Sequence, residues 1–400
     1  MSNETEPQAQ QYPPQVFVKI WNKTFISIFF ASMAMNLGQQ MSTSLLAIYA
    51  DSLGAPATKI GLLISMFALT ALLFKVIAAP AIDTYNRKYL VIGAMLILAA
   101  SFFGFSLSTT LSSLMFFRLL QGIGLAFSNV CCLAMAAESL PKEKYGTGIG
   151  YYSLAQVASQ AVGPAIGLAI AGAIGYPFTF AINAGVMLLA VIAAMRIKIT
   201  FKRTKKLKIT LNNIIAKEAL LPALVQLFLS MQFMVVNSFL IVFAAKQGVT
   251  SNIGFFFTVS FATMLFTRPL VGKLTDKFGL VKVFIPALFS NLIAFILISY
   301  AYTLPLFLLA AFISAFGFGA CTPAIQTLAM KLVSNERRGA GSSTNYIGAD
   351  IGTLIGPVAA GSVAQLFGYA VMWRAMLIPL FIAMSIVFLA RKKIGGVERA

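Results

Sequence analysis

The sequence contains no histidine and few charged residues, and both shortages limit what the protein can be. Only 10% of its 400 residues are charged, whereas 59% are hydrophobic. A soluble domain carries about 25% charged residues, so a chain this apolar has too little polar surface for water. Without histidine there is no His-based metal site and no Ser-His or Cys-His catalytic set. We expect neither an enzyme nor a soluble protein.

Cysteine and nucleotide-binding motifs are equally scarce. The three cysteines, Cys131, Cys132 and Cys321, lie inside apolar stretches and have neither the number nor the spacing of a disulfide framework or a zinc site. The sequence has no phosphate-binding loop ending in Gly-Lys-Ser/Thr, which argues against direct pumping by ATP. We therefore expect no metal and no cofactor, with a proton gradient as the driving force of any active transport.

The sequence does contain a succession of long apolar segments. A membrane-spanning helix needs about 20 mainly apolar residues, and twelve such segments can be counted. Barrel strands would be about 10 residues long and would alternate polar with apolar, which these segments do not. The sequence predicts an all-α membrane protein of two six-helix bundles, with spans at 24–50, 58–80, 88–108, 111–137, 145–173, 176–195, 218–243, 251–271, 281–301, 304–330, 340–366 and 369–390.

The basic residues predict the orientation of these spans. Lys59 and Lys246 are the only basic residues in the loops on one side, four more lie within spans, and the rest fall on the other side or in the tails. Basic loops stay in the cytoplasm, so we expect both termini to be cytoplasmic and the membrane to be the inner membrane of a bacterium. The net charge of +19 then reflects orientation and attraction to anionic lipid, and no nucleic-acid partner is needed.

An internal repeat relates the two halves of the chain. At one constant spacing and without a gap, Ile60-Gly61 matches Ile253-Gly254, and Gly163-Pro164 matches Gly356-Pro357. The repeat divides the chain into a disordered tail at 1–15, a bundle at 16–195, a basic linker at 196–217, a bundle at 218–390 and a tail at 391–400. Halves of equal topology are related by an axis along the membrane normal, and the substrate site of such folds lies between them near the midplane.

The loops after the second and eighth spans carry a motif. The second copy reads Gly272-Lys-Leu-Thr-Asp276-Lys-Phe-Gly279, and the first keeps Asp83, Arg87 and Lys88 but lacks both glycines. The motif resembles a loop motif of the major facilitator superfamily, and the resemblance covers nearly the whole chain. It implies the major facilitator fold, with Asp83, Arg87, Lys88, Gly272, Asp276 and Gly279 as a cytoplasmic gate. An ordinary interfacial turn with solvated charges is the alternative.

Two further motifs resemble those of the same family. Arg118-Leu-Leu-Gln121-Gly122-Ile-Gly124 is similar to a motif of its proton-coupled members, although Arg118 could instead extend toward the interface. Gly150, Gly163-Pro164 and Gly167 resemble the glycine-proline motif of its antiporter branch, and Gly352, Gly356-Pro357 repeat the pattern. Small residues allow helices in lipid to approach closely, so we expect these residues to serve as a hinge and seal between the halves.

Asp350 is the strongest candidate for proton coupling. It is the one acid well inside a span, and an ionisable residue there is functional by default. Arg118 could act with it, while Asp51, at the end of the first span, should be solvated. Uncharged polar residues at span depth are candidates to line a substrate cavity; they are Asn36, Gln39, Gln40, Asn129, Gln156, Gln160, Gln232, Asn237, Gln326, Asn345 and Tyr346.

These features favour a secondary active transporter, in which a proton gradient drives efflux of amphipathic small molecules by alternating access. A proton-coupled importer or a facilitator of a polar metabolite is the alternative within transport. A non-transporting membrane sensor is the alternative outside it. The expected partners are a small-molecule substrate and the lipid bilayer, with the protein acting as a monomer.

Overall fold

The computed structural model describes residues 20–140, 145–196, 215–333, 338–392 and 394. The predicted tail at 1–15 and most of the linker and C-terminal tail lie outside these residues. Within them the chain is helical and contains no strand. The helices are α1 (Lys23–Ser52), α2 (Ala57–Thr84), α3 (Arg87–Leu107), α4 (Leu111–Glu138), α5 (Tyr145–Ile174), α6 (Tyr176–Met195), α8 (Leu220–Lys246), α9 (Phe255–Phe278), α10 (Leu280–Ser299), α11 (Leu304–Lys331), α12 (Arg338–Phe367), α13 (Tyr369–Ala375) and α14 (Leu377–Leu389).

The helices correspond to the twelve predicted spans, because α13 and α14 form one span interrupted at Met376. Ten spans in the described part of the chain are long and apolar enough to cross a membrane. The exceptions are α1, which carries Asn36, Gln39 and Gln40, and α9, whose apolar stretch ends at Thr267. In α1, polar residues take the place of apolar ones, which marks this helix as a candidate to line a polar path.

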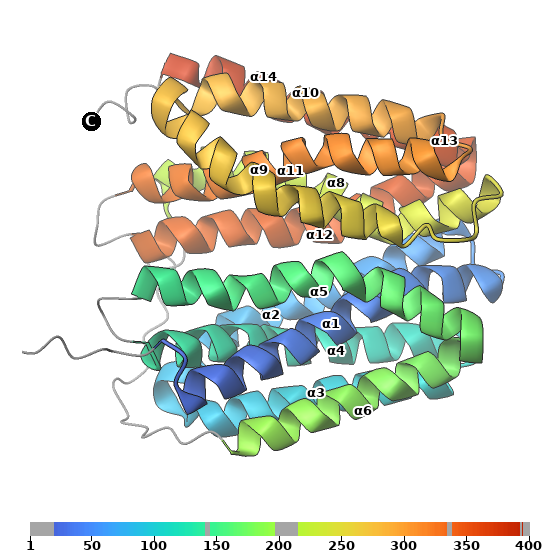
Figure 1. Ribbon diagram of the computed structural model, residues 1–400, viewed down its shortest axis with the longest axis vertical. Helices are drawn as coiled ribbons and strands as arrows, with labels where there is room; N and C mark the ends of the chain where they lie inside the picture. The colour runs from blue at the N-terminus through green and yellow to red at the C-terminus, as the bar shows by residue number, and fades with distance from the viewer. Residues whose placement is uncertain (1–19, 141–144, 197–214, 334–337, 393, 395–400) are drawn as a thin grey trace, which may run out of the picture.

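The helices meet at two ends of the molecule, which we name by their connections. The linker end holds the start of α1 and the turn at Tyr85–Asn86, and the distal end holds the turns at Leu53–Pro56 and Gly175. Figure 1 shows the linker end at the left. Gly279 has a φ of 86°, a left-handed conformation that suits glycine, at the α9–α10 turn. The α2–α3 turn lacks this glycine, and the Asn86 side chain instead accepts a hydrogen bond from the Lys88 amide.

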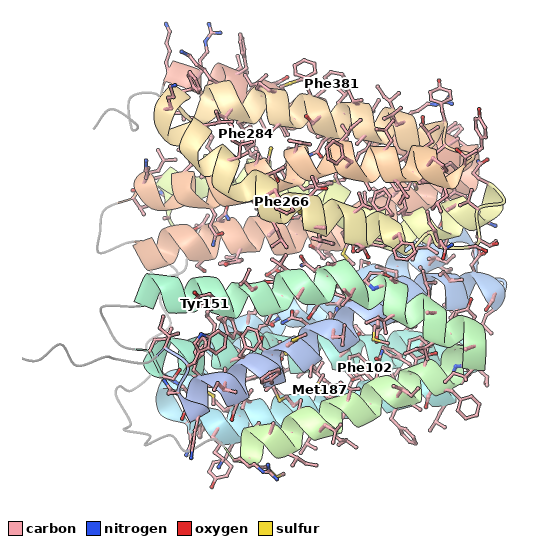
Figure 2. All side chains as sticks on the ribbon, viewed as in Figure 1. Phe102, Tyr151, Met187, Phe266, Phe284 and Phe381 are labelled. Atoms are coloured by element: carbon pink, nitrogen blue, oxygen red, sulfur yellow. The ribbon has the colours of Figure 1, made fainter. Side chains whose placement is uncertain are left out.

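The first six helices pack with one another and α8–α14 pack with one another, as the lower and upper parts of Figure 1 show. Between the two groups, α2 packs on α12, α5 on α9, and α1 on α8. The first two pairings are equivalent under the internal repeat, as an axis between the halves requires. The outer faces carry exposed apolar side chains such as Phe266 and Phe381, as expected of a surface in lipid (Figure 2).

The buried core joins the two halves at the distal end. One cluster of buried side chains includes Leu45 and Ile64 of the first half together with Phe239 and Phe257 of the second. Near the linker end, the second half has a separate core around Leu229, Phe284 and Ile325. The described residues therefore form an arrangement in which the halves are packed together on the distal side.

Candidate functional site

A cavity of about 230 Å³ lies between the two halves of the molecule. Its walls come from α1, α2 and α4 of the first half and from α8 and α12 of the second. Polar and apolar side chains share the lining, which consists of Gln39, Gln40, Thr43, Phe67, Ala68, Ala71, Lys75, Leu125, Asn129, Phe233, Met234, Asn237, Asp350 and Thr353. A mixed wall of this kind suits a small amphipathic molecule.

Two opposite charges meet on the wall of this cavity. The Lys75 ammonium donates to Oδ1 of Asp350 at 2.8 Å and to Oδ2 at 2.7 Å. Lys75 is on α2 and Asp350 on α12, so the ion pair connects the two halves. The side chains are 32% and 20% exposed, which leaves both accessible from the cavity. The pair is the only ionic contact between the halves at cavity depth among the described residues.

Arg118 is completely buried behind the cavity, and it does not extend to the interface as the sequence alternative allowed. Its guanidinium donates to Oε1 of Gln121 at 2.7 Å and, more weakly, to Oγ1 of Thr43 and the Ile64 carbonyl at 3.4 and 3.3 Å. It also lies 4.5 Å from the centre of the Phe67 ring. Arg118 thus links α1, α2 and α4, and two of its neighbours, Thr43 and Phe67, line the cavity.

A hydrogen-bond chain connects this buried charge to the cavity. The Gln121 side chain accepts from Arg118 and donates through Nε2 to Oε1 of Gln39 at 2.7 Å. Gln39 lines the cavity, so a ligand that contacts it would affect the chain that holds Arg118. Arg118 does not contact Asp350, although the sequence suggested that the two might act together; Lys75 takes that place.

The predicted cavity residues divide into two groups. Gln39, Gln40, Asn129 and Asn237 line the cavity, as does Asp350, the residue predicted for proton coupling. The others lie elsewhere: Asn36 donates to the Ser32 carbonyl, Gln232 is buried and donates to the Met376 carbonyl, Asn345 is buried, Gln326 donates to the Tyr346 hydroxyl, Gln156 is exposed and Gln160 is partly exposed.

Lys75 is the charged cavity residue that the sequence-based site prediction does not include. It is one of the four basic residues within spans, but the coupling candidates are Asp350 and Arg118. A charge in lipid costs at least about 2.5 kcal/mol, so it needs a partner. Asp350 was the one acid at that depth, and these two facts together could have predicted the pair.

The glycines of the two glycine-proline motifs pack within each half. An added Cβ at Gly163 would lie 2.8 Å from Cβ of Gln40, and one at Gly352 would lie 2.1 Å from the Leu227 carbonyl oxygen. These contacts join α5 to α1 and α12 to α8, whereas Pro357 of the second motif lies against Gly61 of the other half. Gly167 and Gly356 make the same kind of contact with Met41 and Met231.

Other glycines provide the close contacts between the halves. An added Cβ at Gly61 would lie 2.1 Å from the Pro357 carbonyl oxygen, and one at Gly254 would lie 2.7 Å from Cα of Ala165. Gly61 and Gly254 occupy matching positions of the repeat, so the two distal contacts are equivalent.

We call the packed contact between the halves at the distal end the distal closure. Polar contacts reinforce it. Oγ1 of Thr258 donates to the Ala161 carbonyl at 2.7 Å, and Thr58 is hydrogen-bonded to Gln365. Asp51, expected to be solvated, is partly exposed but lies 3.6 Å from Nζ of Lys246 on the other half.

The predicted gate motif lies largely outside the described side chains. This holds for the side chains of Asp83 and Asp276 and for the surroundings of Gly272, and in the glycine-proline motif it holds for Gly150. In the other motif, Gly122 allows α4 to contact α2, since an added Cβ would lie 2.3 Å from the Phe67 carbonyl oxygen. Gly124 allows α4 to approach Leu98 of α3 in the same way.

Comparison with known proteins now decides the family. The profile of the Major Facilitator Superfamily matches residues 25–250 and again residues 222–398. The chain belongs to this superfamily. Its members are membrane transporters, so the chain is a multi-pass transporter and the family and fold predicted from the motifs are confirmed.

Several superfamily members are similar along most of this chain. The multi-drug resistance efflux pump PmrA of Streptococcus pneumoniae is 28% identical over 396 residues, which cover 92% of this chain and 95% of that protein. Multidrug resistance protein 1 of Bacillus subtilis is 24% identical over 353 residues, or 85% and 90% of the two chains.

Solved structures share the fold. A mutant of the nucleoside transporter NupG has a TM-score of 0.80 at 12% identity and covers 91% of this chain and 100% of its own. A bacterial homolog of the human lysosomal transporter Spinster has a TM-score of 0.79 at 16% identity and covers 94% and 97% of the two chains.

Proposed function

We propose that this transporter exports amphipathic small molecules in exchange for protons, and that Asp350 exchanges the proton. The observation that carries the proposal is the Lys75–Asp350 ion pair, which joins the two halves inside the cavity between them. Relatives that are named multidrug efflux pumps support the direction of transport. The excess of Lys and Arg near the linker end supports a cytoplasmic position for that end.

The ion pair gives a physical reason for obligatory exchange. In the empty transporter, Lys75 and Asp350 attract each other across the halves and stabilise the arrangement that is packed at the distal end. A proton on Asp350 removes one charge and so weakens this attraction. A substrate that contacts either residue competes for the same interaction. The halves can therefore rock when a proton or a substrate is bound. When neither is bound, the ion pair holds them together, which prevents the empty transporter from changing its state without a cargo.

The cavity also offers apolar surface beside the Lys75–Asp350 pair, from Phe67, Phe233 and Met234. Hydrogen-bond donors and acceptors come from Gln39, Gln40, Asn129 and Asn237. Methionine and aromatic side chains adapt to substrates of different shape. A cationic amphipathic molecule could place its charge at Asp350 and its rings on the phenylalanines, so proton and substrate would exclude each other, as antiport requires.

The proposal is tested by ethidium transport in inverted membrane vesicles with an imposed proton gradient. We expect uptake into acid-interior vesicles and its loss when a protonophore collapses the gradient. Asp350→Asn should abolish gradient-driven accumulation while leaving slow downhill movement, because the variant holds no exchangeable proton and no ion pair. Thr353→Ser is the matched control, since it lines the same cavity without a charge and should retain accumulation.

Other outcomes would replace the proposal. Accumulation that persists in Asp350→Asn would remove the coupling role of this residue. Substrate movement in the same direction as the proton would indicate a proton-coupled importer. Gradient-independent equilibration would indicate a facilitator, and ethidium binding without flux in proteoliposomes would indicate a sensor.

A further inference from the structure

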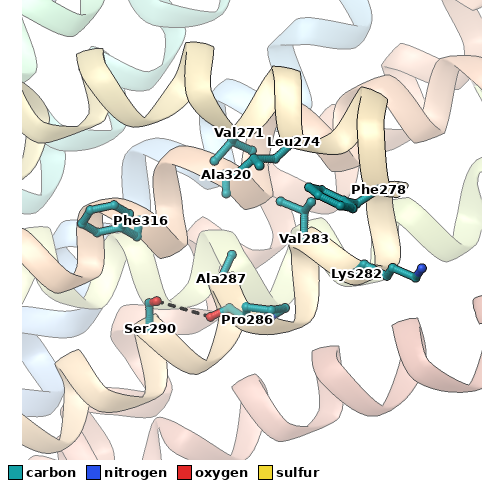
Figure 3. Close-up of a pocket in the computed structure, with 10 residues that line it drawn as sticks. All are labelled: Val271, Leu274, Phe278, Lys282, Val283, Pro286, Ala287, Ser290, Phe316 and Ala320. Atoms are coloured by element: carbon teal, nitrogen blue, oxygen red, sulfur yellow. Dashed lines mark hydrogen bonds between the residues drawn. The ribbon is translucent and has the colours of Figure 1, made fainter.

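A groove of about 440 Å³ is open to the outside of the second half, away from the cavity between the halves. Figure 3 shows its walls, to which α9 contributes Leu274 and Phe278, α10 contributes Val283 and Ala287, and α11 contributes Phe316. Its one polar hydroxyl is satisfied within the helix, because Oγ of Ser290 donates to the Pro286 carbonyl at 3.3 Å. The interior therefore offers an apolar surface without a free hydrogen-bonding side chain.

The groove lies in one leaflet of the membrane. Lys282 is in the first turn of α10 at the linker end, and the helical rise of about 1.5 Å per residue places Ser290 about 12 Å deeper. Half of the hydrocarbon core measures about 15 Å. A second hollow of about 410 Å³, lined by Phe266 and Phe312, adjoins the first through Phe316 and continues toward the midplane. The depth fits one lipid chain that enters from the linker side.

A lysine marks the shallow end of this groove. The Lys282 side chain extends away from the apolar walls beside Phe278 (Figure 3). Lys282 forms no ion pair with any described residue. Its ammonium would therefore lie at headgroup depth with its charge available, directly above an apolar channel.

We propose that this groove binds an anionic phospholipid, with the phosphate on Lys282 and one acyl chain along the wall formed by Ala287 and Ser290. Positive charge at the interface and an apolar channel below it complement the two parts of such a lipid. A zwitterionic lipid would fill the same channel but would gain less from Lys282, because its own cation lies beside its phosphate. The inference concerns lipid binding and does not rest on the proposed direction or coupling of transport.

The test is native mass spectrometry of the purified full-length protein with phosphatidylglycerol and phosphatidylcholine that carry identical acyl chains. We expect the wild type to retain phosphatidylglycerol preferentially. One basic residue near the surface contributes a factor of about five to anionic-lipid binding, so Lys282→Gln should reduce the preference by about that factor. Lys392→Gln is the matched control: it removes a charge exposed at the same end but outside the groove, and should change the preference less.

The acyl-chain part is tested separately by Ser290→Trp, which places a large side chain in the deep end of the groove. We expect it to lower binding of both lipids, whereas Phe289→Trp, on the neighbouring exposed position, should not. Equal effects of Lys282→Gln and Lys392→Gln would overturn the proposal. So would unchanged binding in a folded Ser290→Trp variant, or a dimer whose formation covers this groove and excludes lipid.

Discussion

Lys75 and Asp350 are mutually dependent charges. Removing one partner leaves the other charge unpaired, which costs about 3–5 kcal/mol for a fully buried pair and less where solvent reaches it. At 32% and 20% exposure we expect Lys75→Met and Asp350→Asn to lower the free energy of unfolding by about 1–3 kcal/mol each. The double variant should lose less than the sum. Thermal unfolding in detergent, analysed as a double-mutant cycle, measures this; strict additivity would mean that the two residues do not interact.

Arg118 is expected to be sensitive even to lysine. Its planar guanidinium contacts Gln121, Thr43 and the Ile64 carbonyl at once, and a single ammonium cannot reproduce that geometry. Arg118→Lys should therefore lower the unfolding free energy by about 1–3 kcal/mol, the cost of leaving buried acceptors unsatisfied. Arg374→Lys is a control, because Arg374 stacks on the exposed Tyr300. Equal melting temperatures for wild type and Arg118→Lys would show that these bonds contribute little.

At this scale, the sequence identifies which residues are unusual and does not identify their partners. Asp350 and Arg118 stand out because charges are rare in apolar spans. Asp350 pairs with Lys75 because α2 packs on α12 in one particular register, and residues so far apart in the chain meet through packing that periodicity cannot specify. Gln232 and Asn345 were predicted in the cavity for the same reason that Gln39 was: each is polar at span depth. Which face of the helix meets the cavity depends on the neighbouring helices.

The helix pairs α2–α12 and α5–α9 form the distal closure through glycine. A leucine at Gly61 would collide with the backbone carbonyl of Pro357, which cannot move aside as a side chain can. Gly61→Leu should therefore shift the transporter toward a state open at the distal end. Gly254→Leu should do the same, because it stands at the matching position of the repeat. Gly93→Leu is the matched control, since no atom outside its own helix lies within 4 Å of an added Cβ.

The shift can be measured as a distance between spin labels at Thr109 and Tyr302, which lie on distal connections of the two halves, with the three buried native cysteines replaced. We expect Gly61→Leu to increase the population with a longer distance, and Gly93→Leu to match the parent. An unchanged distribution in a folded Gly61→Leu protein would show that this contact does not control the closure. The sequence repeat predicted the equivalence of Gly61 and Gly254, but it did not show that they, rather than Gly163 and Gly356, lie between the halves.

At the scale of the whole molecule, the packing defines an asymmetric state. The main buried cluster continues from one half to the other at the distal end, while the second half keeps its own core near the linker end. Apolar lengths matched to the bilayer predicted the helices, and the repeat predicted two equivalent bundles. Neither could predict which end is packed together, because alternating access requires one sequence to support both arrangements at similar free energy.

The orientation of the whole molecule in the membrane is a separate question, and the charge distribution makes a definite prediction about it. Lysine and arginine are retained on the cytoplasmic side during insertion, so Lys59 in the distal region should face outward and Lys331 at the linker end should face the cytoplasm.

Both side chains are exposed, so Lys59→Cys and Lys331→Cys are suitable for labelling. An impermeant maleimide should label Lys59→Cys in intact cells and Lys331→Cys only after permeabilisation. The unsubstituted protein controls for the native cysteines, which are buried. Labelling of both variants in intact cells would contradict the two-bundle topology, because the start of α2 and the end of α11 would no longer lie on opposite sides. Labelling with the sides exchanged would keep the fold but reverse its orientation, so that the end at which the halves are packed together would face the cytoplasm.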